Sequence, residues 1–362
     1  MLYTFPNLID EFNIFFKTYK REELIVCPSE KITNLKPKKE RVCRFCGLNS
    51  SQTTFKKEAH IISAHLGNKY LVSDFECDKC NKFFGDNYED DLAAFLGMSR
   101  TILGVKNRYN KIPTFKSPGK MLVARREEFY GIKEGIKVSR EESTKGIFNI
   151  DAKFGKTEIT YQKHPYTPIK VYKALLKIAL SIIPEQYVAD YRHAFEYLFK
   201  INDKPSDLAK VLHCELPYNH KVENPVCLLF KKLDSTKRTI THVFALYFQN
   251  YVFEFPIPFS EVDKNNDLYN GKPYSIPLCP PILFSEPESE ATFFRTIIDL
   301  SSNESVRGEI ETITFSMDTD RMDKLKAYNP TTGEITDAIF NPDDIIGIYF
   351  APQDSKASFP KN

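Results

Sequence analysis

The sequence predicts an α+β protein in which a small zinc-stapled module is followed by a mixed α/β region and a mainly β C-terminal region. Two C-x-x-C pairs lie close together near the N-terminus. A run near the middle of the chain repeats its apolar residues at helical spacing, and the last third alternates apolar stretches with Pro- and Asn-rich turns. With 362 residues, 42% apolar content and 29 Phe, the chain can bury two or three ordinary cores.

The two C-x-x-C pairs consist of Cys43 with Cys46 and of Cys77 with Cys80. Two residues between the cysteines form a tight turn that directs both sulfurs inward, so four thiolates can surround one zinc ion tetrahedrally. Gly47, directly after the first pair, is typical of such a turn. The alternative is two redox dithiols or buried thiols, which would give no role to the polar residues inside each pair. We therefore expect a structural Zn²⁺.

Four stretches around these cysteines occur in a fixed order. They are C-x-x-C-G from Cys43, F-x-x-E-A-H-I-I from Phe55, L-G-N-K from Leu66 and E-C-x-x-C-N-x-x-F-G from Glu76. In combination they resemble a zinc-stabilised HNH endonuclease of the His-Me finger, or ββα-metal, type. In that family a β-hairpin presents a histidine that deprotonates water, and the following helix supplies a ligand to a divalent ion at the scissile phosphate. Phosphodiester hydrolysis requires both an activated nucleophile and positive charge where negative charge accumulates.

The resemblance makes His60 the general base. The unperturbed pKa of a histidine, about 6.5, leaves much of it neutral near pH 7. The alternative is that His60 only packs or caps. Many HNH enzymes carry an acidic or His ligand directly before the base, where this chain has Ala59. Glu58 lies two residues from His60, and side chains two apart on a strand share a face, so Glu58 is a further candidate for the site. The number of metal ligands therefore stays open.

Two asparagines complete the site that the resemblance implies. Asn81, directly after Cys80, would bind a catalytic Mg²⁺ or Mn²⁺ through its carboxamide oxygen, because hard oxygen donors suit these ions. The alternative is that Asn81 is the N-cap of the helix. Asn68 would orient His60 through the second imidazole nitrogen. The Gly-Asn step that contains it is equally a turn signal.

Three other side chains of this segment are weaker candidates: His65, Glu76 and Glu89. We expect His65 to pack near the zinc or to face solvent. Glu89 lies in an acidic run and is expected to be solvated or ion-paired.

Positive charge is local in this chain, whose net charge is only +2. From Leu92 to Arg126 there are eight Lys or Arg and no acidic residue, and further basic residues precede Cys43. Such a block is expected to neutralise phosphates on either side of a cut. The alternative is a solvated loop rich in lysine. The residues that we expect to contact nucleic acid are Lys39, Arg41, Arg44, Lys69, Arg100, Lys106 and Arg108.

The remaining composition indicates a cytoplasmic protein without a membrane partner. The start of the chain lacks a signal-peptide pattern, and no stretch approaches the apolar length of a membrane span. The other four cysteines are scattered, as is typical of buried thiols in a reducing compartment. DNA is the expected substrate and RNA the alternative. A homodimer would suit a double-strand cut, since one finger cuts one strand, although nothing in the sequence indicates an interface.

Helices are expected at the start and in the middle of the chain. The first runs from Asn7 to Thr18. Pro168 begins a helix whose apolar residues from Val171 to Ile182 keep helical spacing, and which Lys173 and Lys177 make amphipathic. A second helix from Pro184 to about Phe199 completes a pair. Short alternating segments between 104 and 161 predict hairpins, and strands are expected at Val226–Phe230, Thr239–Phe248, Tyr251–Ile257 and Ile310–Ser316.

These elements suggest five segments. They are an N-terminal helix with a basic linker (1–40), the zinc-stapled HNH module (41–105), a basic hairpin region (106–165), a helical pair (166–204) and a mainly β C-terminal domain (205–362). The last segment shows no catalytic constellation, so we expect it to sense or target by binding nucleic acid, a protein or a regulatory ligand.

Two function classes follow. The first is a metal-dependent HNH endonuclease, with a role in bacterial or phage conflict or antiviral defence, because an unrestrained nuclease endangers its own cell. The second is a catalytically inactive, zinc-stapled module that binds nucleic acid or protein. Ala59 is the best argument for the second class, whereas the presence of both His60 and Asn81 favours the first.

Overall fold

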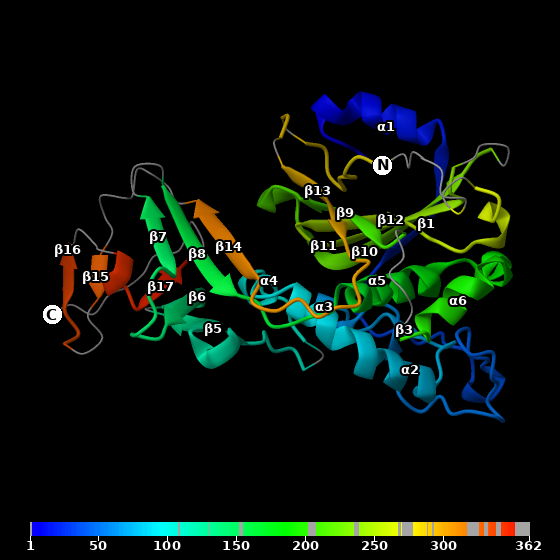
Figure 1. The fold of residues 1–362 in the computed structure, drawn as a ribbon, viewed down its shortest axis with the longest axis horizontal. Helices are drawn as coiled ribbons and strands as arrows, with labels where there is room; N and C mark the ends of the chain where they lie inside the picture. The colour runs from blue at the N-terminus through cyan, green and yellow to red at the C-terminus, as the bar shows by residue number, and fades with distance from the viewer. Residues whose placement is uncertain are drawn as a thin grey trace. The chain divides into compact units, whose positions relative to one another are not determined.

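The computed structural model describes residues 2–107, 109–129, 131–151, 155–201, 208–234, 239–266, 269, 278–287, 289–291, 293–316, 326–328, 332–337 and 342–351. These residues form two units. Unit 1 contains Met1–Ala93, Asn107–Tyr109 and Tyr166–Ser305, and unit 2 contains Ala94–Lys106, Asn110–Pro165 and Val306–Asn362. Helices and sheets are mixed, with mainly β structure towards the C-terminus, so the predicted α+β class is confirmed (Figure 1). The five segments proposed from the sequence stay a prediction, because the division into two units does not test which of the five folds alone.

A six-stranded antiparallel sheet forms the centre of unit 1, in the order β1-β10-β11-β12-β9-β13. Its strands are β1 (Tyr19–Val26), β9 (Lys210–Glu215), β10 (Val222–Lys232), β11 (His242–Gln249), β12 (Tyr251–Pro256) and β13 (Phe294–Asp299). Alternate side chains of β11 reach opposite faces. Val243 and Tyr247 belong to the core beneath α1 (Ile9–Phe16), whereas Phe244 packs on Phe255, which contacts Tyr172 of α5 (Pro168–Ile182). Both faces of the sheet are therefore covered, which explains why β11 is apolar throughout.

Helix α5 lies on one face of this sheet and α1 on the other (Figure 1). Pro168 occupies the first turn of α5, as predicted. The predicted amphipathic character is wrong, since Lys173 and Lys177 are only 1% and 8% exposed. The reason is that α5 contacts the sheet on one side and the zinc-binding module on the other. A helix enclosed on two sides has no polar face.

The other helical predictions are partly confirmed. The predicted helix at Asn7–Thr18 is a 3₁₀ turn at Pro6–Leu8 followed by α1. The second helix of the predicted pair is shorter than expected: two 3₁₀ turns, at Glu185–Tyr187 and Ala189–Tyr191, precede α6 (Arg192–Leu198).

The zinc-binding module contributes a small hairpin and a helix to unit 1. Its elements are 3₁₀ turns at Lys38–Glu40 and Ala64–Leu66, strands β2 (Ala59–His60) and β3 (Val72–Ser73), α2 (Asp78–Phe84), a π-helical turn at Gly85–Glu89 and α3 (Asp90–Phe95). The two strands pair antiparallel, with Ala59 opposite Ser73 and His60 opposite Val72. A hairpin followed by a helix is the ββα order that the resemblance implied.

Unit 2 contains a three-stranded sheet β14-β8-β7 and a four-stranded sheet β17-β6-β5-β4. Its elements are α4 (Ser99–Ile102), 3₁₀ turns at Pro118–Lys120 and Pro342–Asp344, and strands β4 (Phe115–Lys116), β5 (Leu122–Phe129), β6 (Ile132–Arg140), β7 (Phe148–Asp151), β8 (Lys156–Gln162), β14 (Ile310–Ser316), β15 (Lys326–Tyr328), β16 (Ile335–Asp337) and β17 (Gly347–Phe350). The hairpins predicted between 104 and 161 are confirmed. Buried Met98, Leu122, Val138 and Ile159 share one core.

Strand β1 was not predicted. Its sequence, YKREELIV, is highly charged and was taken for the start of a polar linker. The strand lies at an edge of the sheet, where charged side chains are common because they discourage pairing with another chain. The strands predicted at Val226–Phe230, Thr239–Phe248, Tyr251–Ile257 and Ile310–Ser316 are confirmed as β10, β11, β12 and β14. Among the described helices, none combines the length and the apolar character needed to cross a membrane.

Candidate functional site

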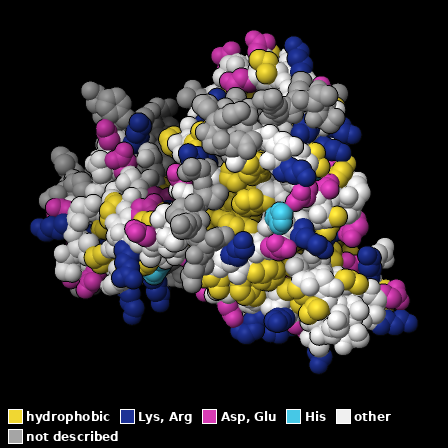
Figure 2. Space-filling view, turned by 45° about the vertical axis from the view of Figure 1, so that its right-hand side comes forward, with side chains coloured by type: hydrophobic (Ala, Val, Ile, Leu, Met, Phe, Trp, Pro, Cys, Tyr) yellow, Lys and Arg dark blue, Asp and Glu magenta, His cyan; other side chains and the backbone are white. Residues whose placement is uncertain are grey.

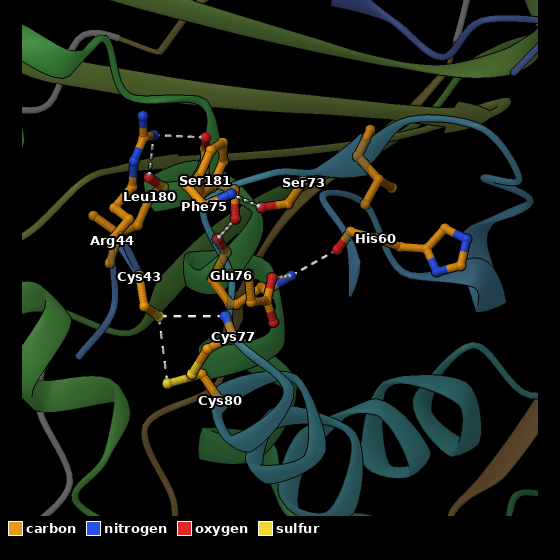
Figure 3. Close-up of polar contacts among 12 residues, drawn as sticks. Cys43, Arg44, His60, Ser73, Phe75, Glu76, Cys77, Cys80, Leu180 and Ser181 are labelled. Atoms are coloured by element: carbon orange, nitrogen blue, oxygen red, sulfur yellow. Dashed lines mark hydrogen bonds and ion pairs between the residues drawn. The ribbon is translucent and has the colours of Figure 1, made fainter. Parts of the chain in front are cut away.

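The four cysteines of the module form one cluster. The Sγ atoms of Cys43 and Cys80 lie 3.7 Å apart (Figure 3). Those of Cys46 and Cys77 lie 3.8 Å apart. Four sulfurs at about 2.3 Å from a tetrahedral zinc lie about 3.8 Å from one another. A disulfide would require about 2.05 Å. The cluster therefore fits a structural zinc ion, as predicted.

Local backbone bonds build this cluster from the sequence. The N–H of Cys43 donates to the carbonyl of Leu48, and the N–H of Gly47 donates to the carbonyl of Cys43, which closes the first turn. Gly47 has φ +74°, a conformation that favours glycine. The N–H of Cys77 lies 3.5 Å from the sulfur of Cys43, so the start of α2 completes the cluster.

The clustered thiols differ in how readily they ionise: the hydrogen bond with Cys80 is the main cause that lowers the pKa of Cys43 to about 5. Burial, with neighbouring Cys43, raises the pKa of Cys46 to about 11. Zinc binds thiolates and would supply the missing positive charge, which couples ion binding to folding of the module.

Asp78, the first residue of α2, ties the helix to the segment that precedes the hairpin. Its carboxylate accepts hydrogen bonds from the backbone N–H groups of Lys56 (3.0 Å) and Lys57 (2.8 Å) and from the hydroxyl of Thr54 (2.5 Å). A carboxylate in the first turn also favours the positive end of the helix dipole. The segment entering β2 is thus fixed relative to α2.

His60 is the last residue of β2 and is half-buried. Its ring points away from the labelled cysteines and from Glu76 (Figure 3). The Nε2 atom lies 3.4 Å from the carbonyl oxygen of Lys69. A carbonyl only accepts, so this contact favours the tautomer with its proton on Nε2 and leaves the lone pair on Nδ1. Burial lowers the pKa of His60 and Lys177 acts in the same direction, whereas the Lys69 carbonyl and Glu89 raise it, with a net lowering that favours the neutral imidazole.

Asn68 is buried in the loop between β2 and β3. Its Nδ2 donates to the carbonyls of Ile62 (2.7 Å) and Leu71 (2.9 Å), and its Oδ1 accepts from the N–H of Leu71 (2.9 Å). These bonds use both amide hydrogens, so Asn68 does not donate to the imidazole. It braces the loop that presents the carbonyl of Lys69 to His60. The predicted direct contact between Asn68 and the imidazole is therefore not made, and a role of Asn68 in orienting His60 stays a prediction.

Asn81 is the fourth residue of α2, whose N-cap is Cys77. The alternative that Asn81 caps the helix is therefore wrong. Its side chain is half-buried and makes no hydrogen bond within the part of the chain that the structure describes. The carboxamide oxygen is thus uncommitted, as a metal ligand would be before the ion binds.

The two glutamates near His60 have different surroundings. Glu58 is exposed and ion-paired with Lys31, which also lowers its pKa. Glu89, expected to be solvated or ion-paired, is half-buried, lines a small cavity together with Ser63 and Lys177, and acts electrostatically on His60. It ends the π-helical turn, a feature that is often found at functional sites. The sequence did not single out Glu89, because it lies in a run of acidic residues of the kind that is usually exposed to solvent.

The residues expected at nucleic acid are dispersed. Lys39 and Lys106 are exposed, Lys69 and Arg100 are half-buried, and Arg108 lies outside the described residues. Arg41 is 8% exposed and donates to the carbonyl of Lys36. Figure 2 shows Lys and Arg interspersed with Asp and Glu, without one continuous basic surface on that face.

Arg44 has a structural role, because its guanidinium is bonded within unit 1. Its Nη1 donates to the carbonyls of Ser181 (2.8 Å) and Ile183 (2.9 Å) at the end of α5, and its Nη2 pairs with Glu185 (3.1 Å). The guanidinium also stacks 4.0 Å from the ring of Phe75. We therefore leave Arg41 and Arg44 out of the nucleic-acid contacts proposed below.

Within the described residues, the cysteine cluster is the only group of three or more His, Cys, Asp or Glu close enough to hold an ion. A second, catalytic ion near Asn81 would accordingly have one or two protein ligands, with water and phosphate oxygens as the others. This is the usual arrangement for Mg²⁺ at phosphate sites.

A histidine-bearing hairpin, a following helix and a four-cysteine staple define a zinc-stapled ββα module. Residues 43–95 match the family model described as HNH endonuclease, which confirms the resemblance seen in the sequence and indicates a nuclease domain. Neither the curated proteins nor the solved structures gave a match to the chain.

Proposed function

We propose that the protein is a metal-dependent HNH endonuclease that hydrolyses phosphodiester bonds in DNA, with His60 as general base. The observation that carries this proposal is the placement of the His60 ring on the hairpin, where Nε2 lies 3.4 Å from the Lys69 carbonyl oxygen, a contact that favours Nδ1 as the lone-pair nitrogen. Nδ1 takes a proton from water, the resulting hydroxide attacks phosphorus, and the P–O ester bond to the leaving oxygen breaks.

Asn81 is the proposed protein ligand of the catalytic ion, Mg²⁺ or Mn²⁺. Its uncommitted carboxamide, on the helix that follows the hairpin, supports this role. When bound, the ion would supply positive charge at the scissile phosphate. Glu58 is a weaker candidate because Lys31 already pairs with it. The proposed phosphate contacts are Lys39, Lys69, Arg100, Lys106 and Arg108.

The test is plasmid cleavage by the wild type and by His60→Ala, with Mg²⁺, Mn²⁺ or EDTA, with zinc measured in the same samples. We expect cleavage to be lost in the variant and in EDTA, while the zinc content of the variant is unchanged. Loss of zinc and of the fold in His60→Ala would assign His60 a structural role. Cleavage of RNA but not of DNA would correct the substrate.

The second candidate function is a zinc-stapled module that binds nucleic acid or protein without cutting. Ala59 directly before His60, together with the pairing of Glu58 with Lys31, favours it, because both reduce the acidic groups near the proposed ion. Retention of DNA in a gel-shift assay, without cleavage in any divalent metal, would support this function.

We also propose that the regions outside residues 43–95 restrain the nuclease, in a role in defence against phage or a competing element. A finger this small offers few base contacts, so its selectivity must come from elsewhere. Growth of cells that express the wild type or His60→Ala tests the restraint. Equal growth of both would show that the full chain is restrained, whereas toxicity of the wild type alone would show that it is not.

A further inference from the structure

Lys177 of α5 reaches into the zinc-binding module. Its Nζ donates to the backbone carbonyl of His60 at 2.7 Å and lies 2.8 Å from the carboxylate of Glu76. The Lys177 side chain is 10% exposed and that of Glu76 is fully buried. Neither carboxylate oxygen of Glu76 has a directed hydrogen-bond partner among the described residues, so the pair is held chiefly by charge.

The same ammonium group lies near two aromatic rings. It is 5.8 Å from the ring centre of Phe45, inside the first cysteine pair, and 6.0 Å from that of Phe84, at the end of α2. One cation from α5 therefore reaches the first cysteine turn, the hairpin, the approach to the second cysteine pair and the helix.

The hairpin that carries His60 needs such support. Strands β2 and β3 contain two residues each, and a two-stranded hairpin of this size is not stable by itself. The imidazole of His60 is held by the Lys69 carbonyl, and the backbone of the same residue is held by Lys177. Figure 3 shows the carbonyl of His60 directed towards the Glu76 side and the ring directed away from it.

A buried ion pair of this kind is better suited to fixing geometry than to adding stability. Removing two charges from water costs about as much as their attraction returns, whereas each partner left alone is strongly unfavourable. The pair with Glu76 fixes the ammonium of Lys177 in place, and a hairpin that moved away from it would lose the bond from Lys177 to the His60 carbonyl.

We propose that Lys177 is a positioning residue of the nuclease site, which fixes the backbone of His60 from a helix outside the family-matched segment 43–95. This inference rests on the proposed role of His60 as general base. The nuclease site is thus completed by α5 and is not autonomous.

Lys173 provides a matched control one helical turn earlier. It is 1% exposed, donates to the carbonyl of Lys200 and lies 4.1 Å from the ring of Tyr197. Lys173 and Lys177 are thus buried lysines of the same helix that each bond a carbonyl, but the Lys173 partners lie outside the module.

The experiment compares Lys177→Met and Lys173→Met in the full chain. In Lys177→Met we expect kcat for plasmid cleavage to fall by about tenfold to a hundredfold, as for groups that orient a catalytic ligand, at unchanged zinc content. Lys173→Met should keep the wild-type kcat even if its Tm falls. Equal kcat in Lys177→Met and wild type, or an equal loss in both variants, would overturn the proposal.

A double variant separates positioning from charge balance. Glu76→Leu with Lys177→Met leaves no unpaired charge, so its Tm should recover relative to Lys177→Met. Cleavage should stay low, since the carbonyl of His60 still lacks its donor. Recovery of cleavage together with Tm would show that Lys177 only balances Glu76.

A spectroscopic readout keeps this test independent of nuclease activity. The Hε1 resonance of His60, assigned by its loss in His60→Ala, should shift in Lys177→Met and in the double variant but not in Lys173→Met. If the wild type cleaves nothing and the shift is seen, the proposed function fails and the positioning stands. If the resonance does not move, the positioning proposal fails whatever the activity.

Discussion

The Nε2 atom of His60 lies 3.4 Å from the carbonyl oxygen of Lys69, so the loop between β2 and β3 holds the imidazole that β2 presents. This relationship fixes which nitrogen is free. It also makes the reactivity of His60 depend on a loop whose own geometry is set by the buried Asn68.

The pH dependence of cleavage should report on His60. Burial lowers the pKa of this histidine, and a general base works only when it is unprotonated. Cleavage should therefore be lost as pH falls through the lowered pKa, with an apparent midpoint of kcat/KM below the ordinary value of about 6.5. The exposed His193 provides a control, since His193→Gln should leave the profile unchanged. A midpoint above the ordinary value would argue against His60 as the base.

Asn68→Ala should lower both stability and cleavage. The substitution leaves the carbonyl of Ile62 and the N–H of Leu71 without partners, at about 1–3 kcal/mol for each group that stays buried, whereas the carbonyl of Leu71 still accepts the N–H of Ile61. Thermal unfolding and plasmid cleavage are the measurements. Asn49→Ala, at an exposed turn of the same module, should have little effect. If the Asn68 variant is destabilised but cleaves at the wild-type rate, the loop between β2 and β3 has no role in catalysis.

Zinc content should depend on the cluster cysteines and on no other thiol tested. Cys43→Ser should lose the ion and unfold the module, because ion binding and folding are coupled. Cys27→Ala, a buried cysteine outside the cluster, should retain one zinc per chain. Metal analysis and limited proteolysis check both variants. Full zinc content in Cys43→Ser would contradict the assigned ligand set.

Arg44 and Lys39 should give opposite results, although both are basic residues beside the first cysteine turn. Arg44→Met removes donors from the carbonyls at the end of α5 and should lower Tm. The exposed Lys39, as Lys39→Ala, should keep Tm but weaken DNA binding and reduce the slope of log affinity against log salt by about 1. Fluorescence anisotropy at several salt concentrations distinguishes them. A salt slope reduced by Arg44→Met but not by Lys39→Ala would reverse the assignment.

The sequence was most informative where function depends on short spacing. The cysteine turns and His60 are local features, so the motif alone predicted the cysteine cluster and the ββα order, although α2 begins at Asp78, before Cys80. Hydrophobic patterning likewise predicted β10, β11, β12 and β14 in the C-terminal half, but not β9, β13 or β15 to β17. It did not predict their partners, because β14 pairs with β8 and β17 with β6 across long stretches of chain.

The structural features that the sequence did not predict depend on tertiary contacts. Helical periodicity could not show that α5 is enclosed on two sides, and its lysines therefore suggested a solvated face. The positive charge of Arg44 suggested phosphate binding, whereas its partners are carbonyls far along the chain. Strand β1 was hidden by charges that an edge position tolerates.

The enclosure of α5 limits how this nuclease can be rearranged by recombination or by engineering. A domain can be transferred alone only if it buries its own core, yet here α5 packs against the zinc-binding module on one side and against the sheet on the other. A graft of residues 43–95 alone would leave behind an apolar helix in which Lys177 has lost its partners His60 and Glu76, and the transferred hairpin would lack the bond from Lys177. The smallest exchangeable piece therefore includes α5, and any chimera should be cut beyond it.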